Sequence, residues 1–348
     1  MSGDKTHLVV LFGGESAEHD VSCVTAAHVI AAADPNKYDI TAIGIGRDGK
    51  WALSDASPDA LKSGRLAIGS TATSLEAVTH KRTVVMPLLH GPLGEDGTVQ
   101  GMLELANVPF VGSGVLASAL CMDKTMAKQV LAAAGLPQPH FRAVHEPKFD
   151  DSHVDDVIAS IGLPMFVKPA NMGSSVGVRK AKTRAEALGA IRHAFTYDEW
   201  VVCEESIVGR EIEVAVLGNT SPRASLPGEI VAGAEFYDYD DKYLNDSAQL
   251  LIPADLDVDQ TRIVRELAVR IYGELRCEGM ARVDFFLEEK GRGFLCNEVN
   301  TIPGFTPISM YPKMWEATGL PYEKLIDELV ELAIDRHSRR KRSTQVRK

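Results

Sequence analysis

Three oxygen-bearing side chains near the C-terminal end, Asp284, Glu298 and Asn300, are of the types that suit a magnesium site. Mg²⁺ takes oxygen ligands, among them carboxylates and amide carbonyls. The surrounding sequence predicts a β-hairpin whose three-residue turn, Lys290–Arg292, contains a glycine and pairs Asp284 with Glu298. Facing carboxylates repel each other unless a cation or a proton lies between them, so this pairing favours a metal. An ordinary solvated hairpin with acidic residues is the alternative.

The alternation of side chains along a strand divides this hairpin into two faces. One face is expected to carry Arg282, Asp284 and Phe286 from the first strand, and Phe294, Cys296, Glu298 and Asn300 from the second. A register shifted by one residue would separate Asp284 from Glu298. The metal prediction therefore depends on the length of the turn.

A second candidate is the glycine- and serine-rich segment 168–178, with the sequence KPANMGSSVGV, which follows a predicted strand. Its small residues would let backbone N–H groups fold over an anion, with Lys168 as a cation beside it. It differs from a P-loop, because the lysine precedes the glycines and the chain is expected to continue extended over 176–178. We therefore predict a hairpin that covers phosphates, with a flexible loop as the alternative.

Three further segments are candidates for ligand contacts. Glu204 and Glu205 end a predicted strand, where backbone groups could meet a base edge, and Glu211 could bind ribose hydroxyls, although an exposed acidic strand end is the alternative. The turn at Gly13-Gly14 lacks the third glycine of a dinucleotide fingerprint, so the helix N-terminus and Glu18 suit a small zwitterion better. His90 opens the loop HGPLGEDG, where a structural histidine is the alternative to a catalytic one.

The order of predicted elements indicates a protein with three domains. Strands are expected at His7–Phe12, Tyr38–Ile45, Val84–Leu88 and Pro109–Val111, with a helix capped by Ser16, and this alternation predicts a parallel α/β sheet. Beyond residue 112 come helices, strands and the glycine-rich loop, and beyond 205 the sequence is strand-rich. The predicted domains are 1–112, 113–205 and 206–348, with an α+β character in the second and third.

Composition excludes several classes of protein. The chain has 348 residues, of which 45% are hydrophobic and 24% charged, as in ordinary globular proteins. The net charge of −11 argues against sequence-independent binding of nucleic acid, which needs a basic surface. No apolar run reaches the length of a membrane span and no signal-peptide pattern is present, so we expect a cytoplasmic protein. The five cysteines have no metal-type spacing and are predicted to be core residues.

Taken together, the motifs occur in one order that resembles a known family. The segments that carry the resemblance are HGPLGEDGTVQG, ALCMDK ending at Lys124, KPANMGSSVGV, FYDYDDKY, RVDFF and NEVNTIPGFTPISMYP. The chain resembles the D-alanine–D-alanine ligases of the ATP-grasp superfamily across nearly its whole length. The resemblance implies that ATP phosphorylates one D-alanine carboxylate and that the amine of a second D-alanine attacks the acyl phosphate to form the dipeptide.

The resemblance also implies roles for individual residues, listed here by function. The catalytic residues would be Glu18, Ser174, Tyr243, Arg282 and the N–H of Gly304. Glu18 would bind the first ammonium, Ser174 and Tyr243 would link with Glu18 to close the loop over the site, and Arg282 and Gly304 would stabilise an oxyanion. The residues that bind substrate carboxylates would be His90, Ser309 and Met310. The ATP-binding residues would be Lys124, Lys168, Ser175, Glu204, Glu205, Ile207, Glu211 and Lys242. The ligands of two Mg²⁺ ions, or of Mn²⁺, would be Asp284, Glu298 and Asn300.

Three alternatives remain open at this point. Another ligase of the same architecture could use D-lactate, D-serine or a different acceptor, although the Lys242-Tyr243 pair resembles the dipeptide-forming members. A non-catalytic nucleotide-binding regulator would not need the oxyanion donor Arg282. A nicotinamide dehydrogenase lacks support in the glycine pattern. The family also implies a homodimer, and segment 236–246 with the loop at Ser174 is the expected lid.

Overall fold

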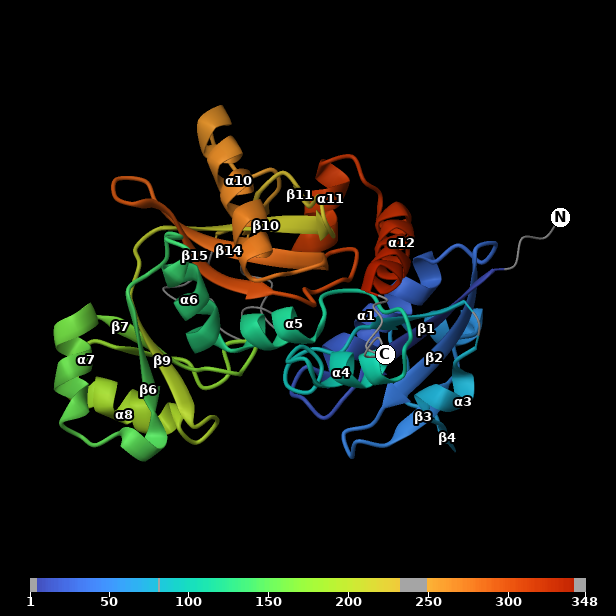
Figure 1. The fold of residues 1–348 in the computed structure, drawn as a ribbon, viewed down its shortest axis with the longest axis horizontal. Coiled ribbons are helices and arrows are strands. Elements are labelled where there is room, and N and C mark those ends of the chain that lie inside the picture. The colour runs from blue at the N-terminus through green and yellow to red at the C-terminus, as the bar shows by residue number, and fades with distance from the viewer. Residues whose placement is uncertain (1–4, 81, 232–248, 341–348) are drawn as a thin grey trace, which may run out of the picture.

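The computed structural model describes residues 5–80, 82–231 and 249–340. They form three β-sheets with helices packed around them, which makes the fold a mixed α/β fold (Figure 1). The sheets draw their strands from three successive parts of the sequence. None of the helices in the described ranges combines the length and apolar character needed to cross a lipid bilayer.

The N-terminal sheet has the order β4-β3-β2-β1-β5. Its elements are β1 (Thr6–Gly13), α1 (His19–Ala32), β2 (Tyr38–Ile45), β3 (Trp51–Ser54), α2 (Pro58–Leu61), β4 (Thr71–Ala72), α3 (Leu75–Val78), β5 (Thr83–Pro87) and α4 (Thr98–Leu105). The predicted parallel pairing is present, because β1 pairs in parallel with both β2 and β5. β3 and β4 add antiparallel strands at one edge, which the sequence did not indicate.

Two local predictions for this sheet are wrong. Segment 109–111 is no strand and makes only an isolated parallel bridge between Val85 and Phe110. Ser16 does not cap the first helix, which begins at His19 with Glu18 as its N-cap residue. The Ser16 hydroxyl instead donates to the carbonyl of His90 at 2.7 Å and therefore holds the loop at His90 beside the turn that follows β1.

The central sheet is antiparallel, with the order β6-β9-β7-β8. The elements of this part are α5 (Val115–Met122), α6 (Lys124–Ala133), β6 (Phe141–His145), the 3₁₀ turn η1 (Glu146–Lys148), α7 (His153–Ile161), β7 (Met165–Pro169), β8 (Arg179–Ala181), α8 (Arg184–Ala194) and β9 (Trp200–Glu205). α7 and α8 cover one face of this sheet, and α6 lies between the sheet and the C-terminal strands (Figure 1). β7 and β8 form the predicted hairpin around the glycine-rich loop.

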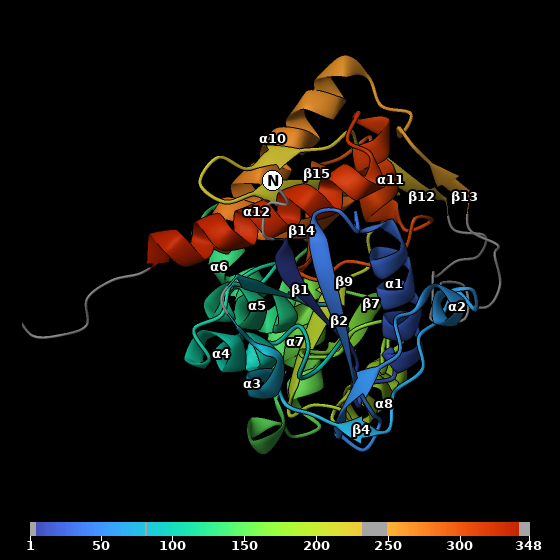
Figure 2. The ribbon, with the colours of Figure 1, turned by 90° about the vertical axis from the view of Figure 1, so that its right-hand side faces the viewer.

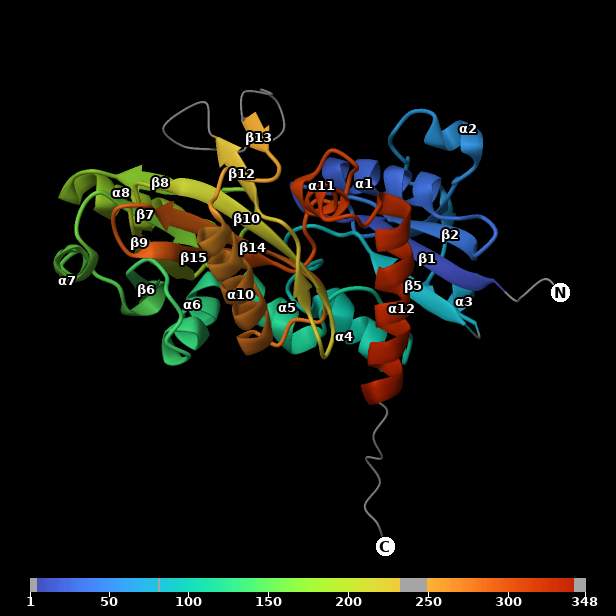
Figure 3. The same ribbon diagram turned by 90° about the horizontal axis from the view of Figure 1, so that it is seen from above.

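The C-terminal sheet has the order β13-β12-β10-β14-β15, with β11 paired to β10. The elements are β10 (Arg210–Gly218), β11 (Arg223–Ala224), β12 (Gly228–Val231), β13 (Gln249–Leu251), α10 (Val258–Glu274), β14 (Gly279–Glu288), β15 (Gly293–Asn300), α11 (Met310–Ala317) and α12 (Tyr322–Arg340). α12 leaves this sheet and lies against the N-terminal sheet and α1 (Figures 2 and 3).

The apolar core includes this contact between α12 and the N-terminal sheet. One continuous cluster joins Leu8, Val10 and Phe12 of β1 with Leu325 and Leu329 of α12. All five cysteines are buried and free, as predicted. The buried Arg336 of α12 also donates to the backbone carbonyls of Phe110 and Gly112, so the end of the N-terminal part is bound to the last described helix. The N-terminal sheet and the C-terminal helices therefore share one core.

Candidate functional site

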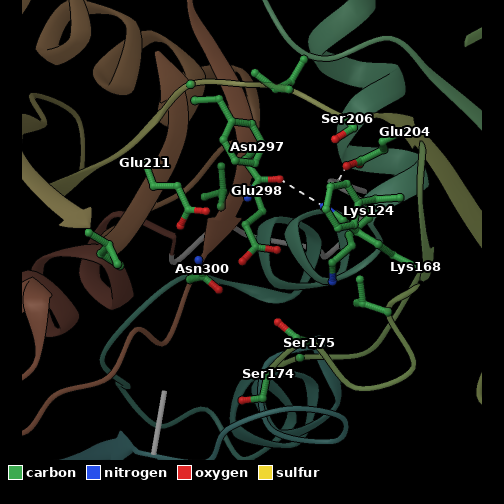
Figure 4. A pocket seen from close by; sticks show the side chains of 18 of the residues that line it. Lys124, Lys168, Ser174, Ser175, Glu204, Ser206, Glu211, Asn297, Glu298 and Asn300 are labelled. Atoms are coloured by element: carbon green, nitrogen blue, oxygen red, sulfur yellow. Dashed lines mark hydrogen bonds and ion pairs between the residues drawn. The ribbon is translucent and has the colours of Figure 1, made fainter. Parts of the chain in front are cut away.

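A cavity of about 640 Å³ lies between the central and C-terminal sheets. Figure 4 shows Glu298 and Asn300 reaching into it from one side, with Lys124, Lys168, Ser174 and Ser175 on the other. The predicted residues that line it are Lys124, Lys168, Ser174, Ser175, Glu204, Glu205, Ile207, Glu211, Glu298 and Asn300. The sequence-based ATP and metal residues outside the masked segment, apart from Asp284, thus meet at one cavity.

The hairpin β14–β15 pairs Asp284 with Glu298, as predicted, but by a different route. The turn contains four residues rather than three, because Glu288 pairs with Gly293. This would break the predicted pairing, but a β-bulge between Asp284 and Phe285 restores it by inserting one extra residue, Asn297, in β15.

The same bulge makes part of the predicted face wrong. Beyond it, Cys296 pairs with Phe285 and Phe294 pairs with Leu287, and all four residues lie in an apolar core. Of the four β15 residues predicted to share the face of Asp284, only Glu298 and Asn300 line the cavity. The extra residue, Asn297, lines the cavity, although the alternation of side chains had placed it on the opposite face.

Asp284 is a buried carboxylate held by two neighbours on the same hairpin. Arg282 donates to both of its oxygens at 2.7 Å, and Asn300 Nδ2 donates to Oδ2 at 2.9 Å. Burial lowers the pKa of Arg282, but the charges of Asp284 and Glu213 outweigh it and raise that pKa overall. The positive charge of Arg282 thus offsets part of the repulsion expected between Asp284 and Glu298.

A third carboxylate stands in the same row across the sheet. Glu213 of β10 pairs directly with Asp284, which pairs in turn with Glu298. Directly paired positions share one face of a sheet, so the three carboxylates form a line across β10, β14 and β15. The Arg282 Nε lies 3.2 Å from Glu213 Oε2, so the guanidinium has carboxylates on two sides.

The donor set suits a hard cation. Asn300 gives its Nδ2 to Asp284, which leaves its Oδ1 as an oxygen donor beside Glu298. Two carboxylates and one amide oxygen are ligands of the kind that Mg²⁺ takes together with water and phosphate oxygens. No group of three or more His, Cys, Asp or Glu side chains in the described ranges forms a metal site by itself.

Two lysines supply positive charge to the same cavity. Lys124, at the start of α6, donates from Nζ to the carbonyl of Met172 at 2.7 Å. Lys168 Nζ lies 2.7 Å from Glu204 Oε2 and 3.2 Å from Asn297 Oδ1. Burial lowers the pKa of Lys124, with the charge of Glu298 opposing it, whereas the charges of Glu204 and Glu298 outweigh burial and raise the pKa of Lys168.

The glycine-rich loop is a series of tight turns rather than the extended segment predicted over 176–178. Val176 N–H donates to the Gly173 carbonyl and Val178 N–H to the Ser175 carbonyl. Ser174 and Ser175 have φ angles of +49° and +59°, in the left-handed region that directs successive N–H groups toward one side. Asn171 binds Asp198 with both its backbone and its side-chain N–H and so anchors the loop.

Glu18 of the N-terminal part reaches this loop. Ser174 Oγ donates to Glu18 Oε1 at 2.5 Å, the contact that the resemblance implies. A Cβ added to Gly173 or Gly91 would come within 2.9 or 3.1 Å of Glu18 Oε2. Glycine at both positions thus leaves room for the carboxylate between two loops that are far apart in the sequence.

His90 is buried next to the same carboxylate. Its Nδ1 lies 3.1 Å from the carbonyl of Ile302 and 3.7 Å from Glu95 Oε1, while Nε2 has no hydrogen-bond partner within the described ranges. Burial lowers the pKa of His90, but the hydrogen bond and charge of Glu95 and the charge of Glu18 raise it overall. A protonated His90 would offer one buried N–H to an anion.

The segment after β15 carries the remaining predicted substrate residues. Gly304 packs closely on Ser309, whose Oγ accepts the Thr306 N–H at 3.1 Å. Ser309 N–H donates to the Thr306 carbonyl here, at 2.9 Å. Met310 begins α11, so its N–H belongs to the first turn, which has no acceptor within the helix. The helix N-terminus is the candidate anion site at this point.

The nucleotide residues differ in what their side chains can reach. The Glu204 side chain is buried between two lysines, and although burial raises its pKa, the charges of Lys128 and Lys168 lower it to about 2. The Glu205 side chain binds His140 N–H and Arg292, and the Glu205 backbone N–H donates to the His140 carbonyl. Glu211 points into the cavity (Figure 4). The predicted Lys242 and Tyr243 lie outside the described residues.

Asn297, Glu213 and Lys128 are among the residues at or near the site that escaped the sequence analysis. Asn297 is a bulge residue, and no local pattern marks the bulge. Glu213 is recognisable only once β10 is paired with β14. Lys128 lies four residues after Lys124, a helical spacing that puts both on one face of α6, and this signal could have found it.

Comparisons with known proteins find relatives that match over nearly the whole length of the chain. Models described as "D-ala D-ala ligase N-terminus" and "D-ala D-ala ligase C-terminus" match residues 7–113 and 130–331. A curated protein named D-alanine–D-alanine ligase from Shouchella clausii is 46% identical over 360 residues, which cover 97% of each chain.

Solved structures give the same result. The D-alanine-D-alanine ligase from Coxiella burnetii has a TM-score of 0.84 and 40% identity, and covers 97% of this chain and 96% of its own. The VanG D-Ala:D-Ser ligase from Enterococcus faecalis has a TM-score of 0.84 and 35% identity, covering 95% and 100%. A Bacillus anthracis ligase complexed with ATP has a TM-score of 0.75 and 27% identity, covering 97% and 100%.

Proposed function

The chain belongs to the D-alanine–D-alanine ligase family, and from this premise we propose how its cavity joins two D-alanines at the expense of ATP. The fold is the ATP-grasp fold, with an N-terminal sheet of Rossmann type. The activity is ATP-dependent ligation, which supplies the dipeptide for peptidoglycan synthesis. The observation that carries the site assignment is the meeting of Lys124, Lys168, Glu298 and the loop at Ser174 around one cavity.

The nucleotide is proposed to lie with its base near Ile207 and its phosphates near the lysines. The backbone from Glu205, the last residue of β9, to Ile207 runs along the cavity. Glu211 also lines the cavity and would take ribose hydroxyls. Lys124 and Lys168, with the N–H groups of the turns at Ser174 and Ser175, would surround the phosphates. Lys242 is proposed to join them on the basis of the family resemblance.

The first D-alanine is proposed to bind where the N-terminal part meets the glycine-rich loop. Glu18 would take its ammonium, and the unpartnered Nε2 of His90 would donate to its carboxylate. The second D-alanine would present its carboxylate to the first turn of α11 at Ser309 and Met310. Because Ser309 N–H donates to Thr306 in this structure, Met310 N–H is the donor that is ready for this contact.

The chemistry proceeds in two steps. The carboxylate oxygen of the first D-alanine attacks the γ-phosphorus of ATP, ADP leaves, and an acyl phosphate forms. The amine of the second D-alanine then attacks the acyl carbon, and phosphate and a proton leave with formation of the peptide bond. Arg282 and the N–H of Gly304 would stabilise the oxyanion between these events. Ser174 and Tyr243 would keep water from hydrolysing the acyl phosphate.

Asp284, Glu298 and Asn300 are proposed to hold two Mg²⁺ ions. Such ions would neutralise the phosphate oxygens, and Mn²⁺ could replace them. Arg282, which binds Asp284 in this structure, would then be shared among Asp284, Glu213 and the reacting carbonyl. We also propose the domain boundaries at 112 and 205 from the order of the elements, a cytoplasmic location from the sequence pattern, and a homodimer from the resemblance.

Product analysis tests the activity and the acceptor together. The enzyme is incubated with ATP, Mg²⁺ and D-alanine alone or paired with D-serine or D-lactate, and the products are identified by mass. D-alanyl-D-alanine with stoichiometric ADP is expected. The similarity to a D-Ala:D-Ser ligase makes D-serine the acceptor to compare first. Absence of the dipeptide, or a preference for another acceptor, would reject the assignment.

A further inference from the structure

A buried chain of charges runs from α6 to the cavity, and Lys128 stands at its far end. Lys128 Nζ lies 3.0 Å from Glu204 Oε1, and the other oxygen of Glu204 lies 2.7 Å from Lys168 Nζ. The side chains of Lys128 and Glu204 are each 3% exposed. Lys168 lines the cavity, whereas Lys128 does not. The order is therefore cation, anion, cation, with only the last cation at the ligand.

Local structure fixes this order. Lys124 and Lys128 lie on one face of α6, one helical turn apart along its axis. Lys124 lines the cavity, whereas Lys128 reaches Glu204 on the central sheet. Glu204 on β9 is paired with Phe141 of β6 and Phe166 of β7, so its side chain has little freedom. Lys128 lies over the ring of Phe141, 6.0 Å from its centre. α6 lies between the central sheet and the C-terminal hairpin (Figure 1).

The charges decide what the chain can do. Without Lys128, Glu204 would cancel the charge of Lys168, and the pair would be neutral toward a polyphosphate. With Lys128, the three groups sum to one positive charge, and that charge is at the cavity. In a buried site, where screening is weak, a unit of charge at this range has a large effect on an anionic ligand.

We propose that Lys128 is a positioning residue for nucleotide binding, which neutralises Glu204 so that Lys168 keeps its charge for the phosphates. The inference rests on the proposed nucleotide site. It predicts an effect of Lys128 on phosphate binding at a distance, with no contact to the nucleotide. Binding of the base should not depend on it.

The ratio of the adenosine Kd to the ADP Kd isolates the contribution of the phosphates. Calorimetric titration of the full chain with each ligand, in the presence of Mg²⁺, gives this ratio. In Lys128→Met it should fall about tenfold, while adenosine binding stays unchanged. In the double variant Lys128→Met/Glu204→Gln it should return to within about threefold of the wild-type ratio, because the neutral glutamine no longer cancels the charge of Lys168.

Lys128→Arg, which keeps the positive charge, is the matched control. The KM for ATP should rise in Lys128→Met with kcat unchanged.

The outcomes separate this inference from the proposed function. If the wild-type chain binds ADP no better than adenosine, the phosphate site itself is wrong. If it does, but Lys128→Met lowers both affinities equally or leaves the ratio unchanged, only the role of Lys128 is wrong. Where Lys128→Met does not fold, the double variant decides, and a ratio reduced about tenfold in it would overturn the inference.

Discussion

The two sides of the cavity are built in opposite ways. On the side of β14–β15, Arg282, Asp284 and Asn300 lie within nineteen positions of each other and are joined by three short hydrogen bonds on paired strands. On the facing side, Glu18 meets Ser174 across 156 positions through a hydrogen bond from the Ser174 hydroxyl. The first side is preformed by local pairing. The second exists only when distant parts of the chain meet, which suits a surface that must open to admit substrate.

Asp284→Asn is the strongest test of the preformed side. Turnover should fall by about 10³-fold or more, since both the proposed metal ligand and the partner of Arg282 are lost. The melting temperature should fall as well, because Arg282 loses a buried carboxylate. The control Glu289→Gln changes an exposed carboxylate near the turn of the same hairpin. Normal turnover in Asp284→Asn would remove the metal assignment.

Ser174→Ala tests the facing side. The kcat/KM for D-alanine should fall about 10- to 100-fold with little change in melting temperature, because one contact between distant segments is lost. Gly173→Ala keeps the Ser174 hydroxyl but puts a methyl group 2.9 Å from Glu18 Oε2. A smaller loss of kcat/KM is expected, since the Glu18 side chain can shift. Steady-state kinetics of both variants provide the measurement. If Ser174→Ala unfolded the protein as readily as Asp284→Asn destabilises it, the contrast between the two sides would fail.

The pH dependence of D-alanine binding sharpens the same contrast at His90. The pKa of His90 is raised in the folded chain, so the protonated, donating form is favoured and is lost as the pH rises through that raised pKa. The KM for D-alanine should therefore increase about tenfold toward high pH. In His90→Gln it should be high and independent of pH in this range. A flat profile in the wild-type enzyme would contradict the proposed contact.

Asn297→Ala should give the smallest effect. It removes one hydrogen bond to Lys168 at 3.2 Å, while Glu204 still holds that lysine. An increase of about two- to fivefold in the KM for ATP is expected, with kcat nearly unchanged. Asn171→Ala, which removes the side-chain hydrogen bond to Asp198 but keeps the backbone one, gives a comparison on the other side of the cavity. A larger loss in Asn297→Ala would mean that the bulge itself positions the hairpin.

The sequence predicted the pairing of Asp284 with Glu298 correctly only because the β-bulge offsets an error of one residue in the predicted length of the turn. It was wrong for Phe294 and Cys296 because these residues lie between the longer turn and the bulge, where the strand register differs by one residue from the predicted register. The parallel strands were predicted from short apolar runs, whereas segment 109–111 looks like a strand but ends at a single bridge. The contacts of Glu18 followed from family resemblance, since no local pattern joins it to Ser174. The chain of charges through Lys128 required the packing of α6 on the sheet.

The shared core has a consequence for synthesis on the ribosome. β1 is made early, yet Leu8, Val10 and Phe12 belong to the same apolar cluster as Leu325 and Leu329 of α12, which are made among the last of the described residues. The early chain must therefore carry uncovered apolar surface until nearly the whole polypeptide has emerged. Removal of α12 should leave the first sheet prone to aggregation, and helper proteins that shield nascent chains would have most work to do on this segment.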